Sequence, residues 1–122
     1  HDESLKIPQL HSKYYTMYNT ITLLREKANK TYKEVKLERH SFYTGKAPAD
    51  VYVKEPFPYK VREKDAIQRH MEADNRVSEA ELKVRYYDVM LKFLEEIIKV
   101  ISNRTFQIKN AIEWHRFQSG FN

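Results

Sequence analysis

Glycine and proline are almost absent from two long stretches of this sequence. The chain has only two glycines, Gly45 and Gly120, and its four prolines all lie outside those stretches. Because glycine and proline are the residues that most often end helices, this distribution favours a few long helices. A length of 122 residues suits one domain and is short for two. We therefore expect an all-α protein in which residues 1–122 form a single helical domain.

The first stretch has the apolar spacing of a coiled-coil helix. Its apolar residues recur at intervals of three and four, an average of 3.5 that is typical of a helix packed along one seam. We predict a helix from about Gln9 to Phe42, within a basic helical region 9–43. Pro8 suits the first turn, where a missing N–H costs nothing, and Gly45 suits the C-terminal stop. The predicted seam is Leu10, Tyr14, Met17, Ile21, Leu24, Ala28, Thr31, Val35 and Phe42.

Residues 44–63 have a different composition and form the predicted connector. They hold three of the four prolines, and the Val-Tyr-Val run at 51–53 has strand-like preference. We expect an irregular, extended segment in which Phe57 and Tyr59 pack against the rest of the chain. A short helix is predicted to follow at 64–73.

Two helix starts are predicted from capping residues. Asp65 is the candidate cap of the short helix. Ser78, followed three residues later by Glu81, has the spacing of a capping box, in which two unpaired backbone donors are satisfied reciprocally. The second long helix is therefore expected to begin at Ser78 and to run to about Gln118.

This second long helix carries two apolar seams. Together they make a face that is wider than one antiparallel partner can cover. We expect one seam to pair with the first long helix and the other to face a neighbouring subunit, so that region 64–122 carries an oligomerisation face. The first seam is Val84, Tyr87, Leu91, Leu94, Ile98, Ile101, Thr105, Ile108 and Ile112. The second is Met90, Phe93, Ile97, Val100, Ala111 and Trp114.

Positive charge is concentrated in the first long helix. The net charge of the chain is +5, and an excess of this sign favours polyanionic partners. From Lys27 to Arg39 a basic residue occurs at every third position. Three helical residues turn 300°, which is 60° short of a full turn, so the cations spiral around the helix. An ordinary solvated face, with Lys30 and Glu34 as an i,i+4 pair, is the alternative interpretation. Aromatic neighbours such as Tyr32 favour a single-strand binder, in which bases stack beside phosphate contacts. The predicted DNA-binding residues are Lys27, Lys30, Lys33, Lys36, Arg39, His40, Phe42 and Tyr43.

Signatures of catalysis and of metal binding are missing from the sequence. The five histidines lack the spacing of metal ligands, and there is no phosphate-binding glycine-rich loop or nucleophile elbow. Cysteine is absent, which excludes disulfides and thiolate metal sites and favours a reducing compartment. No stretch approaches the roughly 20 apolar residues of a membrane span. We predict no catalytic residue, no metal, no cofactor and no membrane partner.

Three segments occur in one order along nearly the whole chain: Ser12-Lys13 before an aromatic, Arg39-x-x-Phe42-Tyr43-Thr44-Gly45, and Arg104-x-Phe106-x-Ile108-Lys109 continuing to Phe117-x-x-Gly120. With these segments the chain resembles the UvsY family of recombination mediators of T-even-like bacteriophages. Compared with that family, an N-terminal segment is expected to be missing before His1. Where the family's basic-aromatic motif has a lysine two residues before the arginine, this chain has Leu37, with Lys36 adjacent.

The resemblance implies a function and a set of partners. Family members bind single-stranded DNA without strong sequence preference and hydrolyse nothing. They contact the phage RecA-like recombinase UvsX and the phage single-stranded DNA-binding protein, and help the recombinase to displace that protein in recombination, repair and replication. The expected location is the cytoplasm of the infected bacterial host. The basic-aromatic motif is implied to carry DNA contact, which places Arg39 first among the candidates.

Assembly is expected to involve the C-terminal region. The resemblance implies a ring-like homo-oligomer of hexamer or heptamer class, which would repeat the basic segment around an axis. Trp and Arg dominate binding hot spots, although Trp114 could instead lie in the core at the end of an amphipathic helix. The predicted oligomerisation residues are Ile101, Arg104, Phe106, Ile108, Ile112, Trp114 and Phe117. A coiled-coil adaptor with no nucleic-acid role, and an RNA-binding or membrane-surface protein, remain as alternatives.

Overall fold

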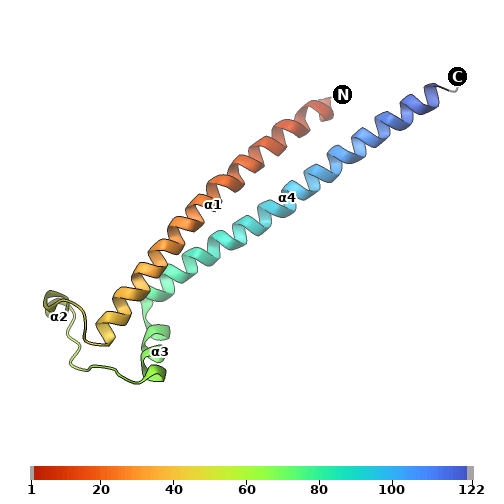
Figure 1. The fold of residues 1–122 in the computed structure, drawn as a ribbon. Helices are drawn as coiled ribbons and strands as arrows, with labels where there is room; N and C mark the ends of the chain where they lie inside the picture. The colour runs from red at the N-terminus through yellow and green to blue at the C-terminus, as the bar shows by residue number, and fades with distance from the viewer. Residues whose placement is uncertain (1, 121–122) are drawn as a thin grey trace. The chain divides into compact units, whose positions relative to one another are not determined.

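A computed structural model describes residues 2–120, with side chains from Lys6 onward. These residues form the helices α1 (Asp2–Tyr43), α2 (Ala49–Lys54), α3 (Lys64–Ala73) and α4 (Asn75–Ser119), and no strand occurs among them (Figure 1). The all-α prediction is confirmed, and the short helix has the predicted bounds. The expected strand-like character of 51–53 is wrong, because that run lies in α2.

The structure divides into two compact units, and both long helices pass through both of them. Unit 1 comprises residues 1–23 and 88–122, and unit 2 comprises residues 24–87. In each unit a segment of α1 packs against a segment of α4. The connector, α2 and α3 belong to unit 2.

In unit 1 the two helix segments pack along an apolar seam. Ile7 and Leu94 are buried, at 6% and 4% exposure, and other residues of the seam, such as Ile21 and Ile98, are half-buried. The Tyr18 hydroxyl donates to Glu95 Oε1 at 2.9 Å across the pair. This hydrogen bond to a carboxylate, helped by burial, raises the pKa of Tyr18. The prediction that α1 starts near Gln9 is wrong, because the helix begins at Asp2 and contains Pro8.

Most inward-facing positions of α1 belong to two series that each repeat every seven residues. Five of the nine predicted seam positions are confirmed, since Tyr14, Ile21, Ala28, Val35 and Phe42 are buried or half-buried. The other four are shifted by one residue. Leu10 and Met17 are each 41% exposed and Leu24 is 39% exposed. The inward positions next to Leu10, Met17, Leu24 and Thr31 are instead His11, Tyr18, Arg25 and Tyr32, and Arg39 continues the same series.

The core of unit 2 is aromatic. Phe42 and Tyr43 at the end of α1 are buried at 2% and 9% exposure, together with Met71 and Val77. The Phe42 ring stacks on Tyr52 at 5.3 Å. The remaining partly buried side chains of this core are Tyr32, Val35, Ala47, Val51, Phe57 and Ile67. The expectation that Phe57 packs is therefore confirmed, whereas Tyr59 touches the edge of Phe57 but is 70% exposed.

The connector folds back over the end of α1 at Gly45. Gly45 has a φ of 77°, which glycine adopts without steric cost and which commonly ends a helix. A Cβ at this position would lie 2.8 Å from the Lys60 side chain. The Val61 N–H donates to the Tyr43 carbonyl at 2.9 Å. The predicted stop at Gly45 therefore coincides with the point where the returning chain crosses the helix end.

Both predicted helix caps are corrected by the structure. The position before α3 is Glu63, which makes no side-chain capping bond, and Asp65 lies in the first turn. Helix α4 begins at Asn75, and Asp74 Oδ1 accepts from the backbone N–H groups of Arg76 and Val77 at 2.9 and 3.1 Å. Because Asp74 already satisfies these donors, Ser78 is not a cap and lies inside the first turn.

The seams of α4 differ in burial. The first predicted seam faces α1 from Val84 to Ile101 and again at half-buried Ile108, whereas Thr105 and Ile112 are exposed. In the second predicted seam, Met90 and Ile97 are half-buried, whereas Phe93 and Val100 are about two-thirds exposed, at 65% and 66%. The described chain therefore leaves an apolar face of α4 uncovered. Its coverage by a neighbouring subunit stays a prediction.

Candidate nucleic-acid interface

Four cations of the predicted row lie on the outside of α1. Lys27, Lys30, Lys33 and Lys36 are all exposed. The Lys36 ammonium lies 4.9 Å from the centre of the Tyr32 ring. Because each step of three residues turns the direction by 60°, these ammonium groups wind around the helix and do not share one face. A flexible phosphate backbone can follow such a path.

The fifth cation of the row, Arg39, is in the interior. It is 4% exposed, and its guanidinium lies 4.2 Å from the centre of the Phe42 ring. It donates from Nε to Asp74 Oδ2 at 2.6 Å and from both terminal nitrogens to Glu55, at 2.9 and 3.0 Å. Such bidentate pairing with a carboxylate is the strongest geometry available to arginine. In this arrangement the guanidinium is occupied and does not reach a phosphate in solvent, so the predicted direct contact is corrected to an interior role.

The groups around Arg39 keep each other charged. Burial lowers the pKa of Arg39, but its hydrogen bonds to Glu55 and Asp74 outweigh this and raise the pKa above its ordinary value. Burial also acts to raise the pKa of Asp74, but hydrogen bonds from Tyr43 and Arg39 lower it overall. The hydrogen bond from Arg39 lowers the pKa of Glu55. The network is therefore fully ionised at neutral pH.

This network joins three parts of unit 2. Arg39 lies on α1, Glu55 follows α2, and Asp74 separates α3 from α4. The Tyr43 hydroxyl adds a further bond to Asp74 Oδ2 at 2.6 Å. Burial and this bond together raise the pKa of Tyr43. The motif around Arg39 is thus a structural junction, which the spacing of its residues in the sequence does not reveal.

The predicted stacking residues are also in the interior. Phe42 and Tyr43 belong to the aromatic core, and Tyr43 stacks on His70 at 5.0 Å. They are therefore not open platforms for bases, and this prediction is corrected. His40, the neighbour of Arg39, is exposed. Tyr32 is the predicted aromatic neighbour that lies against the lysine row, under the Lys36 ammonium.

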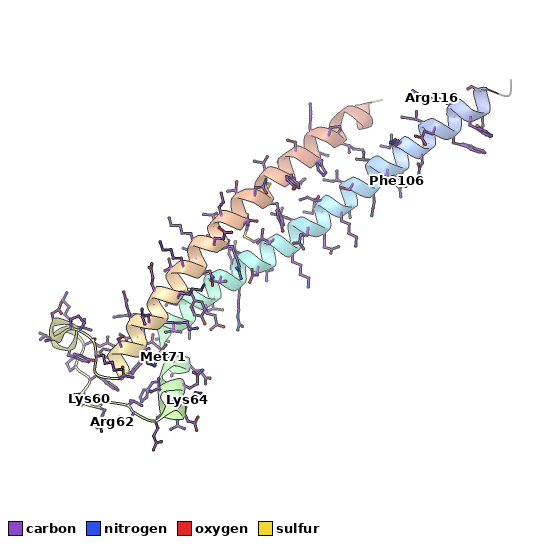
Figure 2. All side chains as sticks on the ribbon, viewed as in Figure 1. Lys60, Arg62, Lys64, Met71, Phe106 and Arg116 are labelled. Atoms are coloured by element: carbon purple, nitrogen blue, oxygen red, sulfur yellow. The ribbon has the colours of Figure 1, made fainter. Side chains whose placement is uncertain are left out.

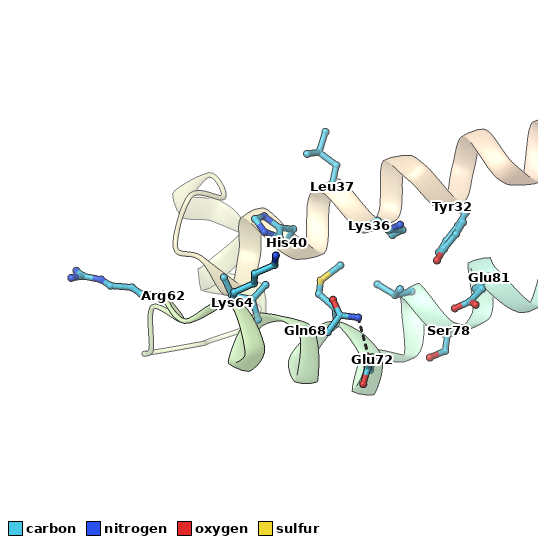
Figure 3. Close-up of a pocket in the computed structure, with 13 residues that line it drawn as sticks. Tyr32, Lys36, Leu37, His40, Arg62, Lys64, Gln68, Glu72, Ser78 and Glu81 are labelled. Atoms are coloured by element: carbon cyan, nitrogen blue, oxygen red, sulfur yellow. Dashed lines mark hydrogen bonds between the residues drawn. The ribbon is translucent and has the colours of Figure 1, made fainter.

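A groove of about 720 Å³ opens beside these residues in unit 2, between α1, α3 and the start of α4 (Figure 3). Its apolar lining includes Ile67, Met71 and Val77, with Tyr32 along the α1 side. Its polar lining is Lys36, His40, Arg62, Lys64, Gln68, Glu72, Ser78 and Glu81.

Sequence reasoning missed two cations of this groove, Arg62 and Lys64, which lie with Lys60 where the connector meets α3. Lys60, Arg62 and Lys64 are exposed and lie at the end of the connector and the start of α3 (Figure 2). They follow the lysine row by more than twenty residues, and only the return of the connector brings Lys64 close to α1. The available signal was the spacing of Lys60, Arg62 and Lys64 at every second residue directly after Tyr59.

The predicted assembly residues fall into two groups. Ile101 and Ile108 are half-buried on the side of α4 that faces α1. Phe106, Trp114 and Phe117 are exposed, at 64%, 59% and 56%, and Figure 2 labels Phe106 on this part of α4. Ile112 is 47% exposed, and Arg104 is also exposed. The Trp114 and Phe117 rings stack on each other at 5.6 Å. The alternative placement of Trp114 in the core is therefore wrong for the described chain.

These features define a class of protein. Its members are helical-hairpin proteins with lysines wound around the first helix and an uncovered apolar face at the end of the last. Among the described helices, none combines the length and apolarity that crossing a membrane requires.

The family is given by a whole-chain match. A family model described as "Recombination, repair and ssDNA binding protein UvsY" matches residues 1–121, so the chain belongs to the UvsY family. This confirms the resemblance seen in the three sequence segments and supports a role in recombination, repair and single-stranded DNA binding. No curated protein and no solved structure matches the chain.

Proposed function

We propose that this protein binds single-stranded DNA through the exposed lysines of α1 and acts as a recombination mediator. As a mediator it helps to load the RecA-like recombinase UvsX onto DNA that is covered by the phage single-stranded DNA-binding protein. Membership of the UvsY family supports the DNA-binding part. The observation that carries the site is the exposure of Lys27, Lys30, Lys33 and Lys36 around one helix.

Arg39 has a different part in this proposal. Its guanidinium fixes the end of α1 to Glu55 and Asp74, and so sets where His40 and Lys36 lie relative to α3. Arg39 therefore supports DNA binding by positioning and does not itself touch the strand. The lysine that the family motif places two residues earlier is Leu37 here, which is 69% exposed, and Lys36 supplies the cation in its place.

Assembly completes the proposal. The exposed apolar residues at the end of α4, such as Phe106 and Trp114, are the surface through which copies of the chain associate into a ring-like homo-oligomer. Repetition of a weak cationic site around an axis gives avidity, because the second and later contacts become intramolecular. The oligomer then holds an extended strand that the recombinase can take over.

The DNA-binding part is tested with a labelled oligonucleotide. We expect the double variant Lys30→Gln/Lys33→Gln to bind it at least about tenfold more weakly at low salt, since each lysine neutralises a phosphate. The matched control is Lys92→Gln/Lys99→Gln, which removes two exposed lysines from α4. A wild-type protein that fails to bind at low salt would favour the coiled-coil adaptor. Competition with RNA and with anionic vesicles separates the remaining alternatives.

The loading part is tested by ATP hydrolysis of the recombinase on DNA covered by the single-stranded DNA-binding protein. We expect the wild-type chain to restore this hydrolysis and the Lys30→Gln/Lys33→Gln variant to restore less of it. If both proteins restore hydrolysis to the same level, loading does not depend on the proposed DNA site.

A further inference from the structure

We propose that the groove between α1, α3 and α4 receives one unstacked base of the bound strand, while Lys36, His40 and Lys64 hold the flanking phosphates. This inference rests on the proposed binding of single-stranded DNA and names the site where a base enters. The groove lies wholly within unit 2, and its volume of about 720 Å³ exceeds what one base requires.

The lining of the groove suits the faces of a base. Met71 and Val77 are buried apolar residues, and Ile67 lies beside them. The Tyr32 ring is half-buried and presents a face that the Lys36 ammonium covers at 4.9 Å. Stacking of a base on an aromatic ring is tolerant of sequence because every base has a π-face. A base on Tyr32 would take the place of the ammonium, and Lys36 would move to the adjacent phosphate.

Positive and negative side chains line different parts of the groove. Lys36 and His40 lie on the α1 side of it, with Lys64 near His40, while Glu72 and Glu81 lie on the side of α3 and α4 (Figure 3). The Arg62 side chain extends away from the other lining residues in the same view. The Gln68 amide donates to Glu72 at 3.0 Å. The groove therefore offers cations at one part, and amide and carboxylate groups at another.

This arrangement favours a nucleotide over an acidic peptide. A nucleotide carries its negative charge on the backbone alone, and its base edge carries hydrogen-bonding groups that an amide or a carboxylate can meet. An acidic peptide would bring carboxylates along its length and would place some of them against Glu72 and Glu81. Like charges so placed repel each other.

The Arg39 junction maintains the shape of this groove. Arg39 and Asp74 hold the end of α1 against the start of α4, and the groove is lined from both of these segments and from α3. Lys36 and His40 flank Arg39 on the same helix. Loss of the junction would therefore open the groove and separate its phosphate-binding groups, although Arg39 itself contacts neither base nor phosphate.

The test blocks the groove without changing its charges. Gln68 is exposed and lines the groove, so Gln68→Trp fills it from the surface. The control is Ala73→Trp, which adds the same ring to the same helix at an exposed residue outside the lining. Each protein is titrated with a normal oligonucleotide and with one that has abasic sites, and thermal unfolding verifies that both variants fold.

We expect Gln68→Trp to bind the normal strand about tenfold more weakly, on the order of one lost stacked base. For the wild type and Ala73→Trp, abasic sites should weaken binding by about the same factor, and for Gln68→Trp that penalty should disappear. An equal abasic penalty in all three proteins would overturn the inference. If the wild type binds no strand at all, the proposed function itself fails, which is a distinguishable result.

The phosphate-binding groups are tested separately. Lys64→Gln should weaken binding of normal and abasic strands alike, whereas Lys54→Gln, an exposed lysine of α2 outside the groove, should have little effect. An acidic peptide is added as competitor. If the peptide binds the wild type but not Gln68→Trp, while DNA affinity is the same for both proteins, the groove is a peptide site and the inference is wrong.

Discussion

Asp74 serves Arg39 and the start of α4 at the same time. Its Oδ2 accepts from Arg39 Nε at 2.6 Å, and its Oδ1 accepts from the backbone N–H of Arg76 at 2.9 Å. One buried carboxylate therefore neutralises the buried cation of α1 and caps the second long helix. The junction fixes the two helices against each other at a defined register.

Removal of the buried cation should be costly for stability. Arg39→Ala leaves the Asp74 carboxylate buried without its counter-charge, and such losses typically cost about 3–5 kcal/mol of the free energy of unfolding. Urea unfolding followed by circular dichroism measures this. Lys33→Ala, at an exposed position of the same helix, should change the free energy by less than about 0.5 kcal/mol. Equal effects of the two substitutions would show that Arg39 is not a structural junction.

The same network predicts loss of stability in acid. The pKa values of Asp74 and Glu55 are lowered in the folded protein. The stability that these two carboxylates contribute is therefore fully present above their unfolded pKa values near 4. It is lost as the pH falls through their lower, folded pKa values. We expect the melting temperature of the wild type to fall more steeply below about pH 4 than that of Asp74→Asn. Parallel curves would contradict this assignment.

Tyr43 predicts an additional loss of stability at alkaline pH. Its pKa is raised above the ordinary value by burial and by its hydrogen bond to Asp74. A raised folded pKa gives stability that is present below the unfolded value near 10 and is lost as the pH rises through the folded value. Tyr43→Phe should therefore flatten the decline of the melting temperature above about pH 10. If the decline of the melting temperature is the same in Tyr43→Phe, groups other than Tyr43 cause it.

The register of α1 predicts unequal effects of neighbouring apolar substitutions. Ile21 is half-buried against α4, whereas Met17 is 41% exposed. Ile21→Gln should cost about 1–3 kcal/mol of unfolding free energy, because it removes buried apolar area, and Met17→Gln should cost less than half of that. Thermal unfolding of the two variants compares them directly. Similar losses for both variants would instead support the seam predicted from sequence spacing, which includes both residues.

Association is predicted to depend on the exposed end of α4. Trp114→Glu should lower the native mass, measured by sedimentation equilibrium, because Trp114 is 59% exposed and its ring has no place in the core. Leu23→Glu, at a residue of α1 that is 67% exposed, is the control and should keep the wild-type mass. An oligomer that survives Trp114→Glu unchanged would move the interface elsewhere.

Much of the fold follows from local patterns. The scarcity of glycine and proline predicts two long helices, and Gly45 marks the end of the first because only a left-handed turn lets the connector cross there. Alternate positions of the α1 seam, such as Tyr14 and Ile21, follow from apolar spacing. The other positions do not. Tyr18 and Arg39, for example, face inward because they make hydrogen bonds to carboxylates far along the chain.

The candidate site is less predictable than the helices, because its residues depend on partners that are distant in the sequence. Arg39 looks like one more member of a basic row until Asp74, 35 residues later, is placed beside it. Lys64 looks like an ordinary surface lysine until the connector returns it to the groove. In both cases the deciding contact is long-range, so no local spacing contains it.

The central claim is that exposed lysines contact the strand, while Arg39 only positions them. The most direct test is the slope of log affinity for single-stranded DNA against log salt concentration. Each lost phosphate contact reduces this slope by about 0.7. We predict this reduction for Lys33→Gln, and for Arg39→Met a weaker affinity with the wild-type slope. A reduced slope for Arg39→Met together with an unchanged slope for Lys33→Gln would contradict the account.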